Sequence, residues 1–125
     1  MTAVMVAGVG AHNVSMERDR IIDTLRATGL RVTAEPRNAQ LPIAFLQRCA
    51  MVPLGNACQS LRIEWTLWLI VKGPDNVDSW DRLERMRQQV WPVLLNKITA
   101  CDPETFPIND TTEAPAFRLR FETVL

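Results

Sequence analysis

Histidine and cysteine are the residue types through which this chain could most readily carry out catalysis. His12 is the only histidine, and no serine or cysteine near it forms a recognisable nucleophile motif. The three cysteines, Cys49, Cys58 and Cys101, are odd in number and lack the Cys-x-x-Cys spacing of zinc sites. We therefore expect free thiols and no disulfide framework.

Two further motifs could bind a ligand, but each has a simpler explanation. Gly8-Val-Gly10 lacks the third glycine and the preceding strand of a dinucleotide-binding loop. Asp75, Asp78 and Asp81 could ligate a cation, yet a turn followed by a capped helix explains their spacing better. We therefore expect no catalytic residue, no metal site and no cofactor, and we predict that the protein is not an enzyme.

Composition gives little indication of a charged partner. The chain has 125 residues, with 14 Lys and Arg against 14 Asp and Glu, which suits one domain over residues 1–125. Arg82, Arg85 and Arg87 alternate with acidic residues, so we expect a solvated helix face and no nucleic-acid recognition. The apolar start, Met1–Ala11, has no Lys or Arg before it and is too short to cross a bilayer. We expect it to pack along the domain edge or onto a neighbour, in a cytoplasmic protein without a membrane partner.

The clearest structural pattern is Leu61–Lys72, whose odd positions are all apolar and therefore predict a strand against a core. The even positions become apolar too at Trp68 and Ile70. This second half must be covered on both faces, either by a second layer of the same chain or by another copy.

The remaining elements follow from periodicity and capping. We predict a helix over about 16–28 capped by Ser15, strands over 30–35 and 43–52, and a second helix capped by Asp78 or Ser79. Residues 101–115 contain three prolines and predict a long loop. The last strand, 116–125, turns Arg118 and Arg120 away from its apolar side, so it should be half-exposed or an edge. The predicted fold is α+β, a single mixed, mainly antiparallel sheet of about four strands with two helices, in the order α-β-β-β-α-β.

This order of elements, over nearly the whole chain, resembles the tail terminator (minor tail, or tail completion) proteins of long-tailed bacteriophages. The likeness is one of pattern and size. It is carried, in chain order, by Glu17–Arg26, Gly29–Val32, a proline-marked stretch, Trp65–Ile70, a helix with Leu83 and Leu94, and Pro115–Arg120.

The resemblance implies a non-enzymatic virion protein that forms a ring, usually hexameric. The ring caps the tail tube, ends tail polymerisation and provides the joint to the head-side connector. Its implied partners are further copies of the chain, the tail tube protein and the connector or completion protein. The implied location is the head-proximal end of the tail, with the host cytoplasm during assembly. From the residues themselves we expect Trp68, Ile70, Arg118 and Arg120 to contact a neighbouring subunit or partner.

Two other functions remain open at the level of sequence. A head-completion or connector adaptor of the phage neck would have a similar size and a similar need to form rings. A small cytoplasmic ligand-binding α+β domain would need a pocket with convergent polar groups. A simpler explanation of Trp68 is that it lies under the first helix.

Overall fold

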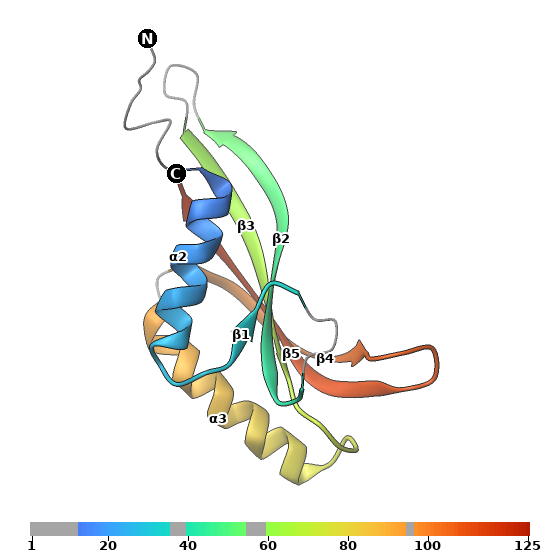
Figure 1. Cartoon of the computed structure of the whole chain (residues 1–125). Helices are drawn as coiled ribbons and strands as arrows, with labels where there is room; N and C mark the ends of the chain where they lie inside the picture. Colours follow the sequence, from blue (N-terminus) through green and yellow to red (C-terminus); the bar gives the residue numbers. More distant parts are fainter. Residues whose placement is uncertain (1–12, 36–39, 55–59, 95–96) are drawn as a thin grey trace.

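The structure, a computed structural model, describes residues 13–35, 40–54, 60–94 and 97–125, without the side chains of Cys49 and Ser60. His12, Gly8–Gly10 and the apolar start lie outside these residues. Two helices pack against one side of a five-stranded sheet, which confirms the predicted α+β class (Figure 1). Neither described helix combines the length and apolarity that crossing a membrane requires.

Helix α2, Val14–Arg26, begins one residue before Ser15, the predicted cap. The cap is Asn13, whose side-chain oxygen accepts a hydrogen bond from the Met16 backbone N–H at 2.9 Å. After the helix, Gly29 has φ +92°, a left-handed conformation that glycine adopts without strain. The helix therefore lies where the sequence predicts it, with a different capping residue.

Helix α3, Val77–Leu94, also begins earlier than predicted. Asn76 is its cap, because the Asn76 side chain accepts from the Ser79 N–H at 3.0 Å and the Asn76 carbonyl accepts from the Trp80 N–H. Ser79 is buried and donates its hydroxyl to the Pro74 carbonyl at 2.6 Å. Asp78 is an exposed first-turn residue, where it favours the positive end of the helix dipole.

The sheet has the strand order β1-β2-β3-β5-β4. β1 runs parallel to β2, and the other three pairings are antiparallel. The last strand of the chain, β5, therefore lies between β3 and β4 and is not an edge. The strand bounds are β1 Val32–Thr33, β2 Ile43–Leu54, β3 Ser60–Ile70, β4 Ile98–Pro107 and β5 Glu113–Val124.

Strand β4 replaces much of the predicted loop over 101–115, so the prediction of four strands was wrong by one. The Val71 N–H donates to the Pro115 carbonyl at 3.2 Å, so the backbone groups of Pro115 point toward β3. Thr105 is paired with Pro115, so it must direct its own N–H away from β5, to the outer edge of the sheet. Every second residue of a strand has the same orientation, so the backbone nitrogens of Pro103 and Pro107 also face this outer edge. Proline is tolerated on an edge strand where no donor to the ladder is needed.

The main core lies between the two helices and the sheet. Trp65 at its centre is 1% exposed, and its indole N–H donates to the Thr123 hydroxyl at 2.9 Å. Each fully buried aliphatic side chain here contributes about 1.5–3 kcal/mol to folding. The core side chains include Ile21, Ile22 and Leu25 of α2, Leu83, Met86, Val90 and Leu94 of α3, and Leu46, Ile63, Leu67, Leu69, Leu119 and Phe121 of the sheet.

Candidate interaction surface

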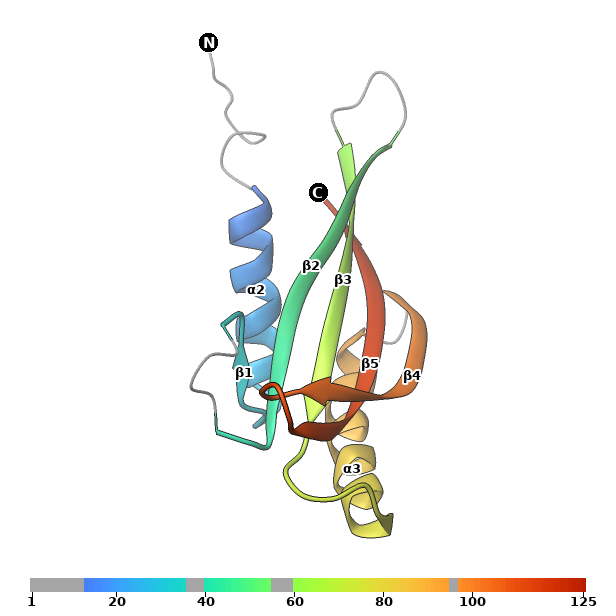
Figure 2. The same ribbon diagram turned by 90° about the vertical axis from the view of Figure 1, so that its right-hand side faces the viewer.

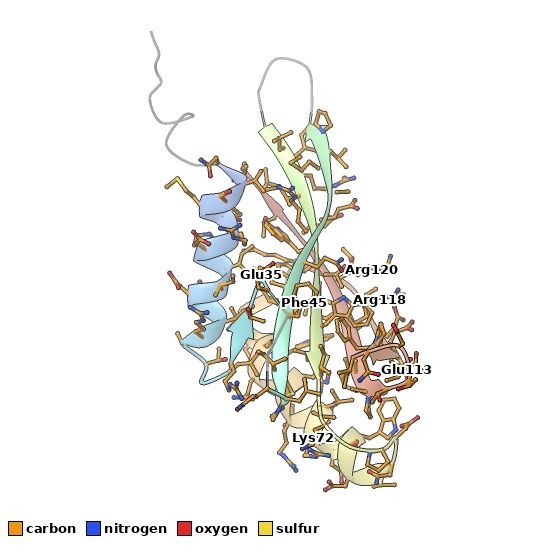
Figure 3. The ribbon with its side chains drawn as sticks, turned by 45° about the vertical axis from the view of Figure 1, so that its right-hand side comes forward. Glu35, Phe45, Lys72, Glu113, Arg118 and Arg120 are labelled. Atoms are coloured by element: carbon orange, nitrogen blue, oxygen red, sulfur yellow. The ribbon has the colours of Figure 1, made fainter. Side chains whose placement is uncertain are left out.

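Neither described helix lies on one side of the sheet, and we call this side the open face. Figure 2 shows the end of the β4–β5 hairpin curling across it, and Figure 3 shows Arg118 and Arg120 projecting from β5 on the side away from α2. The strand register places the following side chains there: Phe45 and Gln47 of β2, Glu64, Thr66, Trp68 and Ile70 of β3, Asp102, Glu104 and Phe106 of β4, and Ala116, Arg118, Arg120 and Glu122 of β5.

Three aromatic side chains meet on the open face, and we call them the aromatic cluster: Phe45, Trp68 and Phe106. Phe106 lies edge-to-face against Trp68, with ring centroids 5.2 Å apart, and against Phe45 at 6.1 Å. Each such contact adds about 0.5–1.5 kcal/mol to the burial of the rings. The Trp68 indole N–H donates to the Gln47 side-chain oxygen at 3.2 Å.

Trp68 remains half-buried in this arrangement. It lies on the side of the sheet opposite the helices, so the alternative that places it under the first helix is wrong. A half-exposed indole with one polar end satisfied is typical of residues that contribute strongly to protein interfaces.

Ile70 has a different environment from Trp68. It is 1% exposed and packs with Ile43, Ala114 and Ala116 beneath the β4–β5 hairpin. The second layer over this part of β3 therefore comes from the chain itself. Ile70 belongs to the core and has no free surface for a partner, which corrects its predicted role as a contact residue.

The two arginines of β5 lie next to the aromatic cluster with different partners. Arg118 is paired with Trp68 across the strands, and its guanidinium lies 3.7 Å from the Asp102 carboxylate and 3.5 Å from that of Glu104. Arg120 is exposed, and among the described residues no acidic side chain forms an ion pair with it. Arg120 therefore offers a full charge to a partner, whereas Arg118 is partly neutralised.

Beyond the arginines, the open face becomes a shallow hollow of about 560 Å³. Glu64 and Glu122 are directly paired across the strands, and Arg62 lies 3.5 Å from each carboxylate. The hollow is lined by Gln47, Ala50, Glu64, Trp65, Thr66, Trp68, Thr99, Arg118, Arg120, Phe121 and Glu122. The open face thus has an apolar half around Phe106 and a charged half around Arg120.

The groups with displaced pKa values lie away from the open face. On α3, hydrogen bonding to Arg87 lowers the pKa of Glu84, with an Arg87 Nε to Glu84 Oε1 distance of 2.7 Å. On β4, burial raises the pKa of the Cys101 thiol. Over the described residues, no three His, Cys, Asp or Glu side chains are grouped closely enough to hold a metal ion.

Sequence reasoning missed Phe45 and Phe106 as members of this surface. Phe45 is the direct cross-strand partner of Trp68, so its side of the sheet could have been inferred once the register between β2 and β3 was known. Phe106 stands between Pro103 and Pro107, where the prolines favoured a loop over a strand. A search with family models finds no match to the chain, and no curated protein sequence is significantly similar to it.

Proposed function

We propose that this protein is a structural subunit that assembles through its open face into a ring, in the manner of the tail terminator proteins of long-tailed bacteriophages. The ring would be hexameric, cap the tail tube, end its polymerisation and join it to the head-side connector. The protein would then reside at the head-proximal end of the tail, and in the host cytoplasm during assembly.

The observation that carries this proposal is the half-buried Trp68 beside the exposed Arg120, on the side of the sheet opposite the two described helices. Tryptophan and arginine are the residue types most enriched among those that dominate binding energy at protein interfaces. In a ring each subunit contacts its two neighbours through two different surfaces, and we propose that the open face is one of them. The net charge of zero adds little repulsion between copies.

The experiment combines light scattering with electron microscopy of the purified protein, alone and mixed with uncapped tail tubes. We expect rings at high protein concentration and rings bound at one end of the tubes. A protein that stays monomeric at every concentration and leaves the tubes unbound would contradict the proposal. Binding to isolated head connectors but not to tubes would instead support the neck-adaptor alternative.

A further inference from the structure

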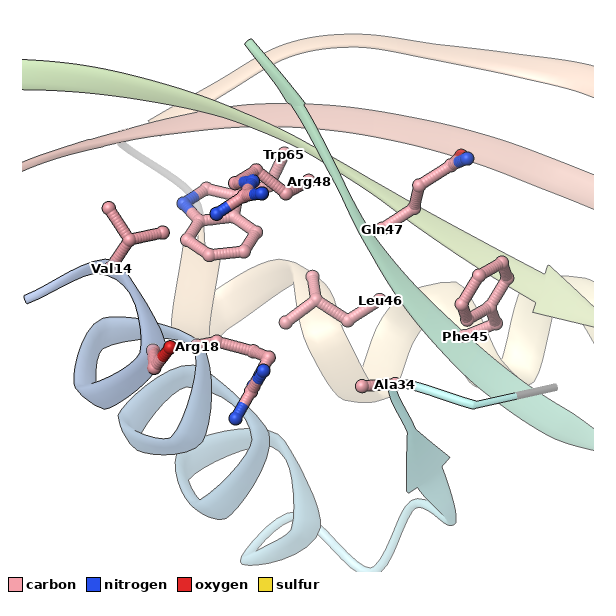
Figure 4. A pocket seen from close by; sticks show the side chains of 9 residues that line it. Val14, Arg18, Ala34, Phe45, Leu46, Gln47, Arg48 and Trp65 are labelled. Carbon is pink, nitrogen blue, oxygen red and sulfur yellow. The ribbon is translucent and has the colours of Figure 1, made fainter. Parts of the chain in front are cut away.

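A second surface lies between α2 and the outer edge of β2, where a cavity of about 390 Å³ opens beyond the end of β1 (Figure 4). Four consecutive β2 residues, from Phe45 to Arg48, line this cavity together with Ala34, which follows β1. Successive strand residues point to opposite faces of a sheet, so a cavity that touches four in a row lies along the strand edge.

The backbone of β2 is available for pairing at this edge. β1 pairs only with Ala44 and Phe45, although β2 continues to Leu54. The Ala44 N–H donates to the Arg31 carbonyl on the β1 side at 2.8 Å, so alternation directs the backbone groups of Arg48 to that same side. No other strand of the described residues borders β2 there, and such an edge can accept an added strand.

The walls of the cavity combine apolar surface with positive charge. Val14 and Ala34 contribute partly exposed apolar side chains over the buried Trp65 and Leu46. Figure 4 shows Arg18 on the helix side and Arg48 on the strand side. Arg48 is exposed and forms no ion pair with another described residue. Arg18 shares its guanidinium with Asp19 at 3.0 Å, which leaves further N–H donors free.

We propose that this groove binds an extended peptide in which a carboxylate side chain is flanked by apolar residues. The peptide backbone adds a short strand to the outer edge of β2, beyond the point where β1 ends at Thr33. The apolar side chains pack against the partly exposed Val14 and Ala34, and the carboxylate lies between Arg18 and Arg48. The register shift between Arg48 and Ala50 limits the added strand to a few residues.

This groove shares Phe45 and Gln47 with the open face, but Trp68 and Arg120 do not line it, so peptide binding does not depend on the proposed ring. The groove lies on the helix side of the sheet edge, whereas Trp68 and Arg120 lie on the opposite side. If the protein forms no rings but binds the peptide, the ring proposal fails and the groove proposal stands. If the protein forms rings but does not bind the peptide, the groove proposal fails and the ring proposal stands.

The test uses a fluorescein-labelled synthetic peptide, Val-Thr-Val-Glu-Val-Thr, with the full-length protein and fluorescence anisotropy as the readout. Two control peptides carry either lysine in place of glutamate or N-methyl groups along the backbone. We expect saturable binding of the first peptide, and at least about tenfold weaker binding of both controls, because each loses hydrogen bonds that a strand or an ion pair requires. Absence of binding, or equal binding of the N-methylated peptide, would overturn the proposal.

Two variants locate the site on the protein. Arg48→Glu should weaken peptide binding at least about tenfold, whereas Arg85→Glu, the same charge change on the exposed surface of α3, should leave it unchanged. Thermal unfolding checks that both variants fold. In amide NMR spectra the peptide should shift the signals of Leu46 and Arg48; shifts confined to Trp68 and Arg118 would overturn the proposal.

Discussion

Phe106 of β4 lies edge-to-face against Trp68 of β3, with ring centroids 5.2 Å apart and planes inclined at 68°. The two residues belong to strands that are not neighbours, because β5 separates β3 from β4 in the sheet. The contact therefore requires the β4–β5 hairpin to curl over the open face, as Figure 2 shows. This curl buries Ile70 completely and leaves Trp68 half-exposed.

Phe106→Ala should destabilise the protein by about 2 kcal/mol, because it removes both aromatic contacts of a half-buried ring. Urea unfolding followed by tryptophan fluorescence measures the change. Ile108→Ala is the control, since Ile108 is 49% exposed close to Phe106 and its truncation should cost less than about 0.5 kcal/mol. Equal losses for the two variants would show that the curl contributes little to stability.

The helices and most strands could be predicted because their burial follows simple periods. The odd positions of β3 face the main core as the alternation indicates, and Leu83, Val90 and Leu94 form the buried side of α3. The capping residues lie two or three positions before the predicted ones. Asn13 and Asn76 compete with nearby Ser and Asp for the same role, and local sequence does not distinguish between good capping residues.

Strand β4 and the burial of Ile70 could not be predicted, since both depend on contacts far along the chain. Pro103 and Pro107 are compatible with a strand only where their nitrogens face an open edge of the sheet. That orientation of β4 follows from the hydrogen bond between the Val71 N–H and the Pro115 carbonyl, which the sequence does not reveal. The apolar pair Trp68 and Ile70 correctly indicated a second layer. The sequence could not separate the residue covered by the chain's own hairpin from the one left half-exposed.

Replacing Pro103 and Pro107 together by valine should make the protein aggregate more readily. Both prolines withhold N–H donors from the outer edge of β4, and valine would restore donors and favour extended structure. We expect faster thioflavin T-positive aggregation at high concentration. The control, Pro92→Ala in α3, should not aggregate faster; if it does, a general loss of stability rather than an exposed edge is the cause.

Cys101 should react slowly with alkylating agents at neutral pH. Burial raises the pKa of its thiol, while the nearby charge of Arg87 lowers it, and the thiolate is the reactive form. The alkylation rate is measured against pH in a Cys49→Ser, Cys58→Ser variant, in which Cys101 is the remaining thiol. The midpoint of this pH profile should be higher for the folded protein than for the same protein unfolded in urea. Adding Arg87→Gln should move the midpoint further upward. A folded-state midpoint at or below the value in urea would contradict this reasoning.

The central claim, that the open face joins copies of the protein, is tested most directly by sedimentation velocity over a range of concentrations. Trp68→Glu should weaken self-association at least about tenfold with less than about 2 kcal/mol lost in folding. Val77→Glu, the matched change at a 75% exposed position of α3, should associate like the unaltered protein. If Trp68→Glu associates as strongly as Val77→Glu, or if the unaltered protein remains monomeric throughout, the open face is not the contact between subunits.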